Sequence, residues 1–449
     1  MKYVIVFISL VSTLACAPLK ETAPPSRISG DILSQTKLDV GLFLSTSDPI
    51  VEAQVLNRLK RLQVPVETVK TILLDIAKVQ GGPVGMLHGL EIEADGEKYP
   101  YALFVPESAK PGDALPLVVV LHGMGGTGDS ILEPWVKRLS REFIVLCPTY
   151  PMGAWWAQRA EDLVLKLVQT VQSAYPVDLN RVFLVGVSNG AIGAYMIGMF
   201  NPDLFAGIVP IASGITPRYM HFLVNLKNTP IYIIQGVYDP IFPIQLSRRV
   251  HKILTDMKYP VVYREHDKTG TAHGGHFLPK EEVGPLVEWI KKQKRDPLPR
   301  VVRMTREANH LGRINWVRLA KGVQMAALQI PGPEKERTRI RDGKIATLFA
   351  FRTDPNEFTV MGNNMLEFEI FLNSGMIDFN QPVRITTQNL REEKTKMVPE
   401  EKQLRFNHKV KKDLNVLLRS FKTSRDPNLL FDAKVTISME KTFAFLAQP

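Results

Sequence analysis

The residue with the clearest chemical potential is Ser188, at the centre of residues 186–190 (Gly-Val-Ser-Asn-Gly). The apolar run 182–185 before it predicts a buried strand, and the small and apolar residues 191–199 after it predict a helix. A strand, a Gly-x-Ser-x-Gly turn and a helix form the context in which a serine hydroxyl is presented as a nucleophile at the edge of a sheet. The five residues alone also fit a small-residue turn with a solvated serine.

A glycine-rich loop earlier in the chain has the composition to hold a developing negative charge. Residues 117–121 (Leu-Val-Val-Val-Leu) predict a buried strand, and residues 122–126 (His-Gly-Met-Gly-Gly) follow it directly. Glycines let the main chain approach a substrate oxygen, so the N–H of Gly123 or Met124 is one candidate donor and the N–H of Asn189 is the other. The loop histidine is expected to support the turn, because it precedes the serine in the chain.

In a serine triad on this kind of turn, the acid and then the histidine follow the serine along the chain. Residues 231–235 predict another buried strand, and Asp239 lies in the loop after it, where a carboxylate can reach a histidine. Asp239 also fits an ordinary turn residue before Pro240. Asp267 is an alternative acid, although it stands close in sequence to the candidate histidines.

Three histidines compete for the role of general base. His276 is favoured, because the two glycines before it give its loop freedom and residues 277–279 lead into the last helix of this region. His273 is the second choice and His266 the third.

These groups together predict a two-step acyl transfer. Ser188 attacks an ester carbonyl while His276 takes its proton, and Asp239 holds the imidazole in the tautomer that this requires. Water then releases the acid and restores the serine. The sequence has no histidine or carboxylate cluster at metal-ligand spacing, so neither a metal nor a cofactor is part of the prediction.

The order and spacing of these motifs resemble the α/β-hydrolase superfamily over residues 90–294. The similarity is carried by residues 121–126, 178–182, 186–190, 201–207 and 235–243. The most similar group comprises secreted esterases related to polyhydroxybutyrate depolymerases and feruloyl esterases, with dienelactone hydrolases nearby. Dienelactone hydrolases use a cysteine at the position of Ser188, so the chain departs from them there.

Two other classes of protein remain open. A serine peptidase similar to the prolyl oligopeptidase group also has Gly-Gly-His before its last helix, although no propeller-sized domain precedes the region here. The second alternative is a hydrolase-like domain that only binds or tethers. The intact triad candidates count against it, whereas the long C-terminal region is consistent with it.

The elements that must position these residues alternate between strand and helix. Residues 85–295 therefore predict an α/β-hydrolase domain with a mostly parallel sheet flanked by helices, entered through a hairpin at residues 95–96 (Asp-Gly). Cys147 ends an apolar strand pattern and is expected to be a buried thiol. Trp155 and Trp156 follow that strand, where they either line a substrate pocket or cover the core.

After a proline-containing linker at residues 296–299, strands dominate. Residues 300–449 predict a smaller, β-rich, sandwich-like C-terminal domain with one helix at residues 414–421 and no catalytic group. Its strands are expected at residues 314–319, 324–330, 345–351, 366–372, 383–387 and 433–439. Trp316 is expected in the core of this domain rather than on a carbohydrate-binding surface.

The N-terminal residues predict export. A positive start and an apolar stretch predict a signal peptide over residues 1–15, too short to span a bilayer comfortably. Residues 12–16 (Ser-Thr-Leu-Ala-Cys) resemble a bacterial lipobox, which predicts lipidation of Cys16; an ordinary cleavage site is the alternative. Residues 16–30 predict a flexible tether. We expect an envelope protein, anchored in the outer membrane and facing the periplasm or the exterior, or else a secreted one.

Residues 31–84 predict a helical segment with helix starts at Asp48 and Pro65 and no catalytic role. The chain of 449 residues carries a net charge of +11, which favours attraction to anionic envelope surfaces. A nucleic-acid partner is not expected, since the basic residues are scattered and no recognisable reading module is present. The sequence does not indicate an oligomeric state.

Overall fold

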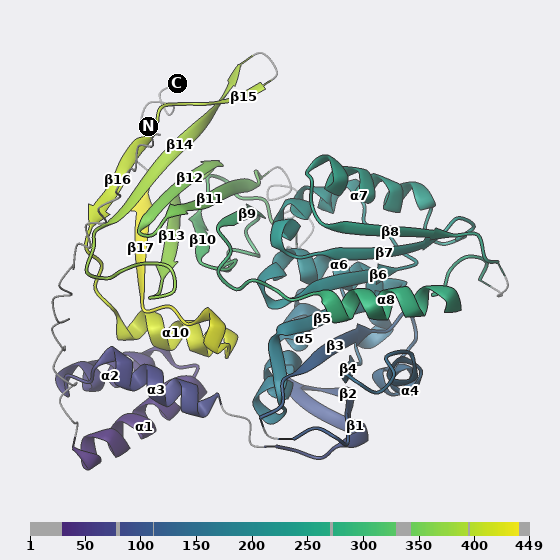
Figure 1. Ribbon diagram of the computed structural model, residues 1–449, viewed down its shortest axis with the longest axis horizontal. Coiled ribbons are helices and arrows are strands. Elements are labelled where there is room, and N and C mark those ends of the chain that lie inside the picture. The colour runs from purple at the N-terminus through teal and green to yellow at the C-terminus, as the bar shows by residue number, and fades with distance from the viewer. Residues whose placement is uncertain are drawn as a thin grey trace, which may run out of the picture.

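The computed structural model describes residues 29–77, 81–110, 112–269, 273–328, 343–393 and 396–439. The predicted signal peptide and Cys16 lie outside these residues. Figure 1 shows three parts: purple N-terminal helices, an α/β part on the right, and a β-rich part that ends in yellow. Within the described ranges, no helix is both long and apolar enough to cross a membrane.

The α/β part is built on one eight-stranded sheet with the order β1-β2-β4-β3-β5-β6-β7-β8. The strands are β1 (Gly85–Ala94), β2 (Glu97–Val105), β3 (Leu115–Leu121), β4 (Ile144–Pro148), β5 (Val177–Val187), β6 (Gly207–Ile211), β7 (Ile231–Gly236) and β8 (Val261–His266). β2 pairs antiparallel with β1 and β4, and all other neighbours pair parallel. These directions and this order are those of the α/β-hydrolase fold, and they confirm the predicted mostly parallel sheet.

Helices cover both faces of this sheet, as its apolar central strands require. On one face, Leu132 of α4 and Leu286 of α8 belong to one core with β3 and β4. On the other face, α5, α6 and α7 share a second core with the sheet. The bounds are α4 (Gly128–Arg138), α5 (Gln158–Ala174), α6 (Asn189–Phe200), α7 (Ile244–Asp256) and α8 (Lys280–Lys292). Each of these helices follows a strand, so the connecting loops lie at the carboxyl edge of the sheet.

The β-rich part consists of two sheets that share one core. The smaller has the order β10-β13-β17, and the larger has the order β15-β14-β12-β11-β9, with β16 also paired to β14. The strands are β9 (Val301–Arg306), β10 (Val317–Lys321), β11 (Ala346–Asp354), β12 (Glu357–Asn363), β13 (Glu367–Leu372), β14 (Val383–Glu393), β15 (Lys396–Pro399), β16 (Gln403–His408) and β17 (Ala433–Ser438). This arrangement confirms the sandwich-like prediction, and Trp316 is fully buried in its core.

Two details of that prediction need correction. The strand expected at residues 324–330 is absent over its described part, where residues 324–328 form a turn and an isolated bridge. Conversely, β9, β12, β15 and β16 form without having been predicted. β9 directly follows the linker and packs against η3 (Pro217–Asn228) of the α/β part.

The N-terminal helices pack on the β-rich part rather than standing alone. They are α1 (Gly30–Ser45), α2 (Pro49–Arg61) and α3 (Val66–Ile76). The predicted helix starts at Asp48 and Pro65 are confirmed, and the Asp48 carboxylate accepts from the N–H of Ile50 at 2.8 Å. Their apolar faces share a core with α10 (Leu414–Ser424), which Figure 1 shows between them and the β sheets.

Candidate active site

The turn that carries Ser188 has an unusual backbone. Ser188 lies between β5 and α6 with φ 58° and ψ −122°, a conformation that costs a non-glycine residue on the order of 1–3 kcal/mol. A Cβ on Gly186 would lie 2.0 Å from the Gly190 oxygen, and a Cβ on Gly190 would lie 2.1 Å from the Leu121 oxygen. Both glycines of the motif are therefore required by close backbone contacts, and the turn has the geometry of a nucleophile elbow.

His276 and Asp239 form a pair at the same edge of the sheet. His276 Nδ1 lies 2.9 Å from Asp239 Oδ2, and the carboxylate is buried. Because the carboxylate can only accept, Nδ1 donates, which leaves Nε2 of this imidazole as the atom that can take a proton. Asp239 follows β7 and His276 follows β8, as the sequence predicts.

Close packing of two loops brings this pair together. A Cβ on Gly236 would lie 2.1 Å from the Gly275 oxygen, and the Gly275 N–H donates to the Tyr238 oxygen at 3.2 Å. The loop after β8 thus lies directly on the loop after β7. The glycines before His276, which the sequence indicated as a source of loop freedom, are instead needed for this contact.

Asp239 accepts hydrogen bonds from other groups besides His276. Its Oδ1 accepts from the N–H groups of Ile241 at 2.9 Å and Phe242 at 3.0 Å, and its Oδ2 accepts from Gln235 Nε2 at 3.0 Å. Burial raises the pKa of Asp239, but the Phe242 amide, the His276 ring and the Ile241 amide together outweigh burial and lower it. The carboxylate is therefore ionised near neutral pH.

The glycine loop lies against the serine. A Cβ on Gly123 would be 3.3 Å from the Ser188 Cβ, so the backbone of this loop passes directly beside the nucleophile. Asn189 is the first residue of α6, where N–H groups point out of the helix and the helix dipole favours negative charge. The backbone of Gly123 and the first residue of α6 thus both lie beside Ser188.

His122 supports the glycine loop. Its Nε2 accepts from the Tyr150 N–H at 3.2 Å, so its Nδ1, 2.7 Å from the Gly123 oxygen, is the donor. Burial lowers the pKa of His122, which favours this neutral form. Trp155 is fully buried and donates to the His122 oxygen at 2.8 Å, whereas Trp156 is exposed. Of the two tryptophans, Trp155 belongs to the core and only Trp156 remains available to a substrate.

The other candidates have different surroundings. His266 is buried at the end of β8, where its Nε2 is 3.2 Å from the Phe277 oxygen. His273 is exposed and its main-chain oxygen accepts from the His276 N–H at 3.1 Å. Asp267 is exposed at the surface. Over the described ranges, no group of three or more histidine, cysteine or carboxylate side chains is arranged to hold a metal.

Comparisons with known proteins agree with this architecture. Residues 157–294 match the family described as phospholipase/carboxylesterase. A poly(3-hydroxyalkanoate) depolymerase C from Paucimonas lemoignei is 30% identical over 123 residues, which cover 24% of this chain and 30% of that protein. The chain thus spans less than a third of the length of this relative.

Two solved structures are similar to the chain over less than half of its length. One is a thermostable esterase, 26% identical with a TM-score of 0.40, covering 46% of this chain and 62% of that one. The other is a carboxylesterase from Bacillus cereus, 21% identical with a TM-score of 0.33, covering 43% and 94%. The strand order of the sheet is that of an α/β-hydrolase domain, and residues 157–294 within it are similar to the phospholipase/carboxylesterase family.

Proposed function

We propose that this protein is a serine carboxylesterase that works through an acyl-enzyme intermediate. The observation that carries the proposal is the 2.9 Å contact between His276 and the buried Asp239, at the edge of the sheet where the strained turn presents Ser188. A serine, an oriented imidazole and two sets of backbone donors are the parts that acyl transfer needs. The family to which residues 157–294 are similar also supports this reaction class.

In the proposed reaction, Ser188 Oγ attacks the ester carbonyl and its proton passes to His276 Nε2. The oxyanion of the tetrahedral intermediate accepts from the N–H of Asn189 and from that of Gly123 or Met124. Collapse breaks the bond to the alcohol, which takes the proton from His276 and leaves. Water then gives a proton to His276, attacks the acyl carbon and releases the carboxylic acid from Ser188.

The rim of this site favours an ester with an apolar part. Five large apolar side chains are exposed on the loops that carry the site: Met124, Met152, Trp156, Tyr238 and Ile241. They follow β3, β4 and β7. Apolar residues gathered around a polar reaction centre are typical of a surface that binds an apolar ligand. We therefore propose an acyl chain, an aromatic acid or a polyester segment as the part that rests on this rim.

Ser188→Ala tests the reaction. We expect the variant to fold, to lose labelling by a fluorophosphonate and to lose aryl-ester hydrolysis by at least about 10⁴-fold, because the covalent intermediate cannot form. Ser173→Ala, on the exposed last turn of α5, should keep full activity. A panel of esters and matched amides separates an esterase from a peptidase. Unchanged turnover in purified Ser188→Ala would refute the proposal.

We also propose that Cys16 is lipidated and anchors the mature protein in the cell envelope. The lipobox-like residues 12–16 and the net charge of +11 support this location. Cys16→Ser should move the protein from the membrane fraction to the soluble fraction or block its processing. Mass spectrometry that finds an unmodified mature chain would contradict the proposal.

A further inference from the structure

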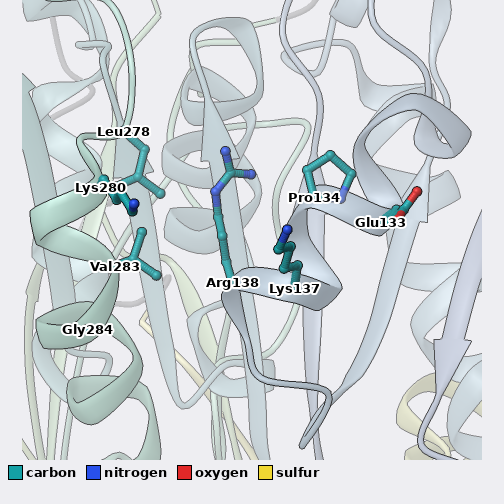
Figure 2. Close-up of a pocket in the computed structure, with 8 residues that line it drawn as sticks. All are labelled: Glu133, Pro134, Lys137, Arg138, Leu278, Lys280, Val283 and Gly284. Atoms are coloured by element: carbon teal, nitrogen blue, oxygen red, sulfur yellow. The ribbon is translucent and has the colours of Figure 1, made fainter.

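A cavity of about 690 Å³ lies between α4 and α8, away from the proposed triad. Figure 2 shows the residues that line it: Glu133, Pro134, Lys137 and Arg138 from α4, and Leu278, Lys280, Val283 and Gly284 from the start of α8 and the loop before it. Ser188, Asp239 and His276 are not among them. This α4–α8 groove has a volume that suits an organic ligand.

The charges in the α4–α8 groove are unbalanced. Three cations, Lys137, Arg138 and Lys280, line it against one carboxylate, Glu133. Among the contacts of the described residues, none of the three cations forms an ion pair or a side-chain hydrogen bond; Arg138 only stacks on Trp135, with its Cζ 5.2 Å from the ring centre. Two other carboxylates are engaged elsewhere: Glu282 pairs with Arg264 at 3.2 Å, and Glu142 pairs with Lys291 at 2.8 Å, while Glu281 is exposed at the start of α8.

Arg138 is the distinctive member of this set. Cations at the end of a helix such as α4 are common, because they complement its dipole. Such residues usually project into water, whereas Arg138 is partly buried, and burial lowers the pKa of its guanidinium with no carboxylate to offset the effect. In Figure 2 its side chain extends into the space between the two helices. An arginine in this setting can bind a carboxylate through two parallel hydrogen bonds.

The rest of the groove is apolar. Leu278 and Val283 pack against the core beneath it, and Pro134 adds an apolar surface on the α4 side. Gly284 faces open space, since a Cβ built there has no neighbour within 4 Å. Cationic side chains beside an apolar surface favour a ligand that has an anionic group and an apolar chain.

We propose that the α4–α8 groove binds an organic carboxylate with an apolar chain, the class of acid that the hydrolysis proposed above would release. Its carboxylate pairs with Arg138 and Lys280, and its chain lies on Leu278 and Val283. Leu278 stands two residues after His276, so the bound acid lies against the segment that carries the general base. The groove is thus a product site separate from the site of catalysis.

Calorimetry with octanoate tests the groove, using full-length protein whose serine has first been blocked with a fluorophosphonate. We expect one binding site that survives the block. Arg138→Gln should weaken octanoate binding by about tenfold or more, because a hydrogen-bonded charge pair is lost. Gly284→Leu should weaken it as well by filling the groove, since a Cβ built on Gly284 meets no other segment within 4 Å.

Lys292→Gln is the matched control, since Lys292 is an exposed cation of α8 outside the groove and should leave binding unchanged. Acetate has the carboxylate without the apolar chain, and octanol has the chain without the carboxylate. Both should bind much more weakly than octanoate. Equal binding of acetate and octanoate, or wild-type affinity in both groove variants, would overturn the proposal. If the fluorophosphonate fails to label the protein, the proposed reaction is refuted. Octanoate binding by the same variants, measured on unlabelled protein, then still tests whether the groove is the binding site.

Discussion

At the scale of single residues, Asp239 is held ionised by more groups than a triad needs. Two backbone N–H groups and the His276 ring lower the carboxyl pKa despite burial, and the Gln235 amide also donates to this carboxylate. Gln235 is fixed in turn, since its Oε1 accepts from the Ser213 N–H at 2.9 Å. Asp239 therefore stays ionised, and able to hold the His276 ring, to a lower pH than an ordinary aspartate would.

His276→Ala should be as damaging as loss of the serine. The imidazole both accepts the serine proton and returns it, so we expect ester hydrolysis to fall by several orders of magnitude with the fold unchanged. His273→Ala and His266→Ala serve as controls and should keep most activity, because Asp239 pairs with His276 and the His266 Nε2 lies 3.2 Å from the Phe277 oxygen. Steady-state kinetics on the three variants decides this. An inactive His273→Ala beside an active His276→Ala would show that the loop has been assigned wrongly.

The sequence indicated the candidate reacting residues more clearly than the residues that hold them in place. Ser188 and Asp239 were recognisable because each follows a buried strand within a few residues. Gln235 and Tyr150 were not, because their roles depend on partners in other loops: Gln235 reaches Ser213, and the Tyr150 N–H reaches His122. Such contacts between distant segments leave no periodic pattern in the sequence.

At the scale of elements, α10 joins the two ends of the chain. Leu417 and Phe421 of α10 share a core with Phe43 of α1 and Leu59 of α2. Lys70 of α3 also pairs at 3.1 Å with the buried Asp432, just before β17. The N-terminal helices and the β-rich part therefore form one packing unit, although the α/β part separates them in the sequence.

Leu417→Ala tests this shared core. Leu417 is fully buried, so its truncation should lower the free energy of unfolding by about 2–5 kcal/mol. Leu38→Ala, on the exposed side of α1, should change it by less than about 0.5 kcal/mol. Urea unfolding followed by circular dichroism measures both. Neither variant should alter ester hydrolysis per folded molecule, and a fully stable Leu417→Ala protein would argue against the shared core.

Elements with a strong local signal were predicted well, and those defined by distant partners were not. α5 was expected at residues 158–174 and has those bounds, because its apolar residues repeat at helical spacing. α1 was not predicted as a separate helix, since part of its buried face packs on α10, which lies nearly the whole chain away. β12 was not predicted, because it is a short segment and its pairing partners, β11 and the parallel β14, are not apparent from its own residues.

At the scale of the whole molecule, buried polar contacts link the α/β part to the β-rich part. Asn225 Nδ2 donates to the Thr305 oxygen at 3.2 Å, and the Thr305 N–H donates to Asn225 Oδ1 at 2.6 Å. Arg295 pairs with the buried Asp426 and also donates to Asn180 Oδ1 at 3.1 Å. The β-rich part thus packs on the helical face that supports the Ser188 turn.

One buried cluster makes this interface sensitive to pH. His310, after β9, contacts Glu307 through Nδ1 and Glu161 of α5 through Nε2 at 3.0 Å, and its ring stacks on Phe200 of α6 at 3.6 Å. The buried Arg306 is the other charged group of the cluster. Burial acts to lower the pKa of His310, but the hydrogen bonds and charges of the two glutamates outweigh burial and raise it to about 8. The two glutamates carry two negative charges and Arg306 carries one positive charge. The net charge of the cluster is therefore zero only while His310 is protonated.

We therefore expect the protein to lose stability as the pH rises through 8. Since the pKa of His310 is higher in the folded state than its ordinary value of 6.5, the protonated ring contributes its full stabilisation below pH 6.5 and none well above 8. The contribution amounts to about 2 kcal/mol. Melting temperatures measured between pH 6.5 and 9 should fall in the wild-type protein and in the exposed-histidine control His273→Ala. In His310→Gln, which is less stable throughout because it leaves the glutamates without a cation, this fall should be missing; an equal fall in His310→Gln would show that other groups set the alkaline limit.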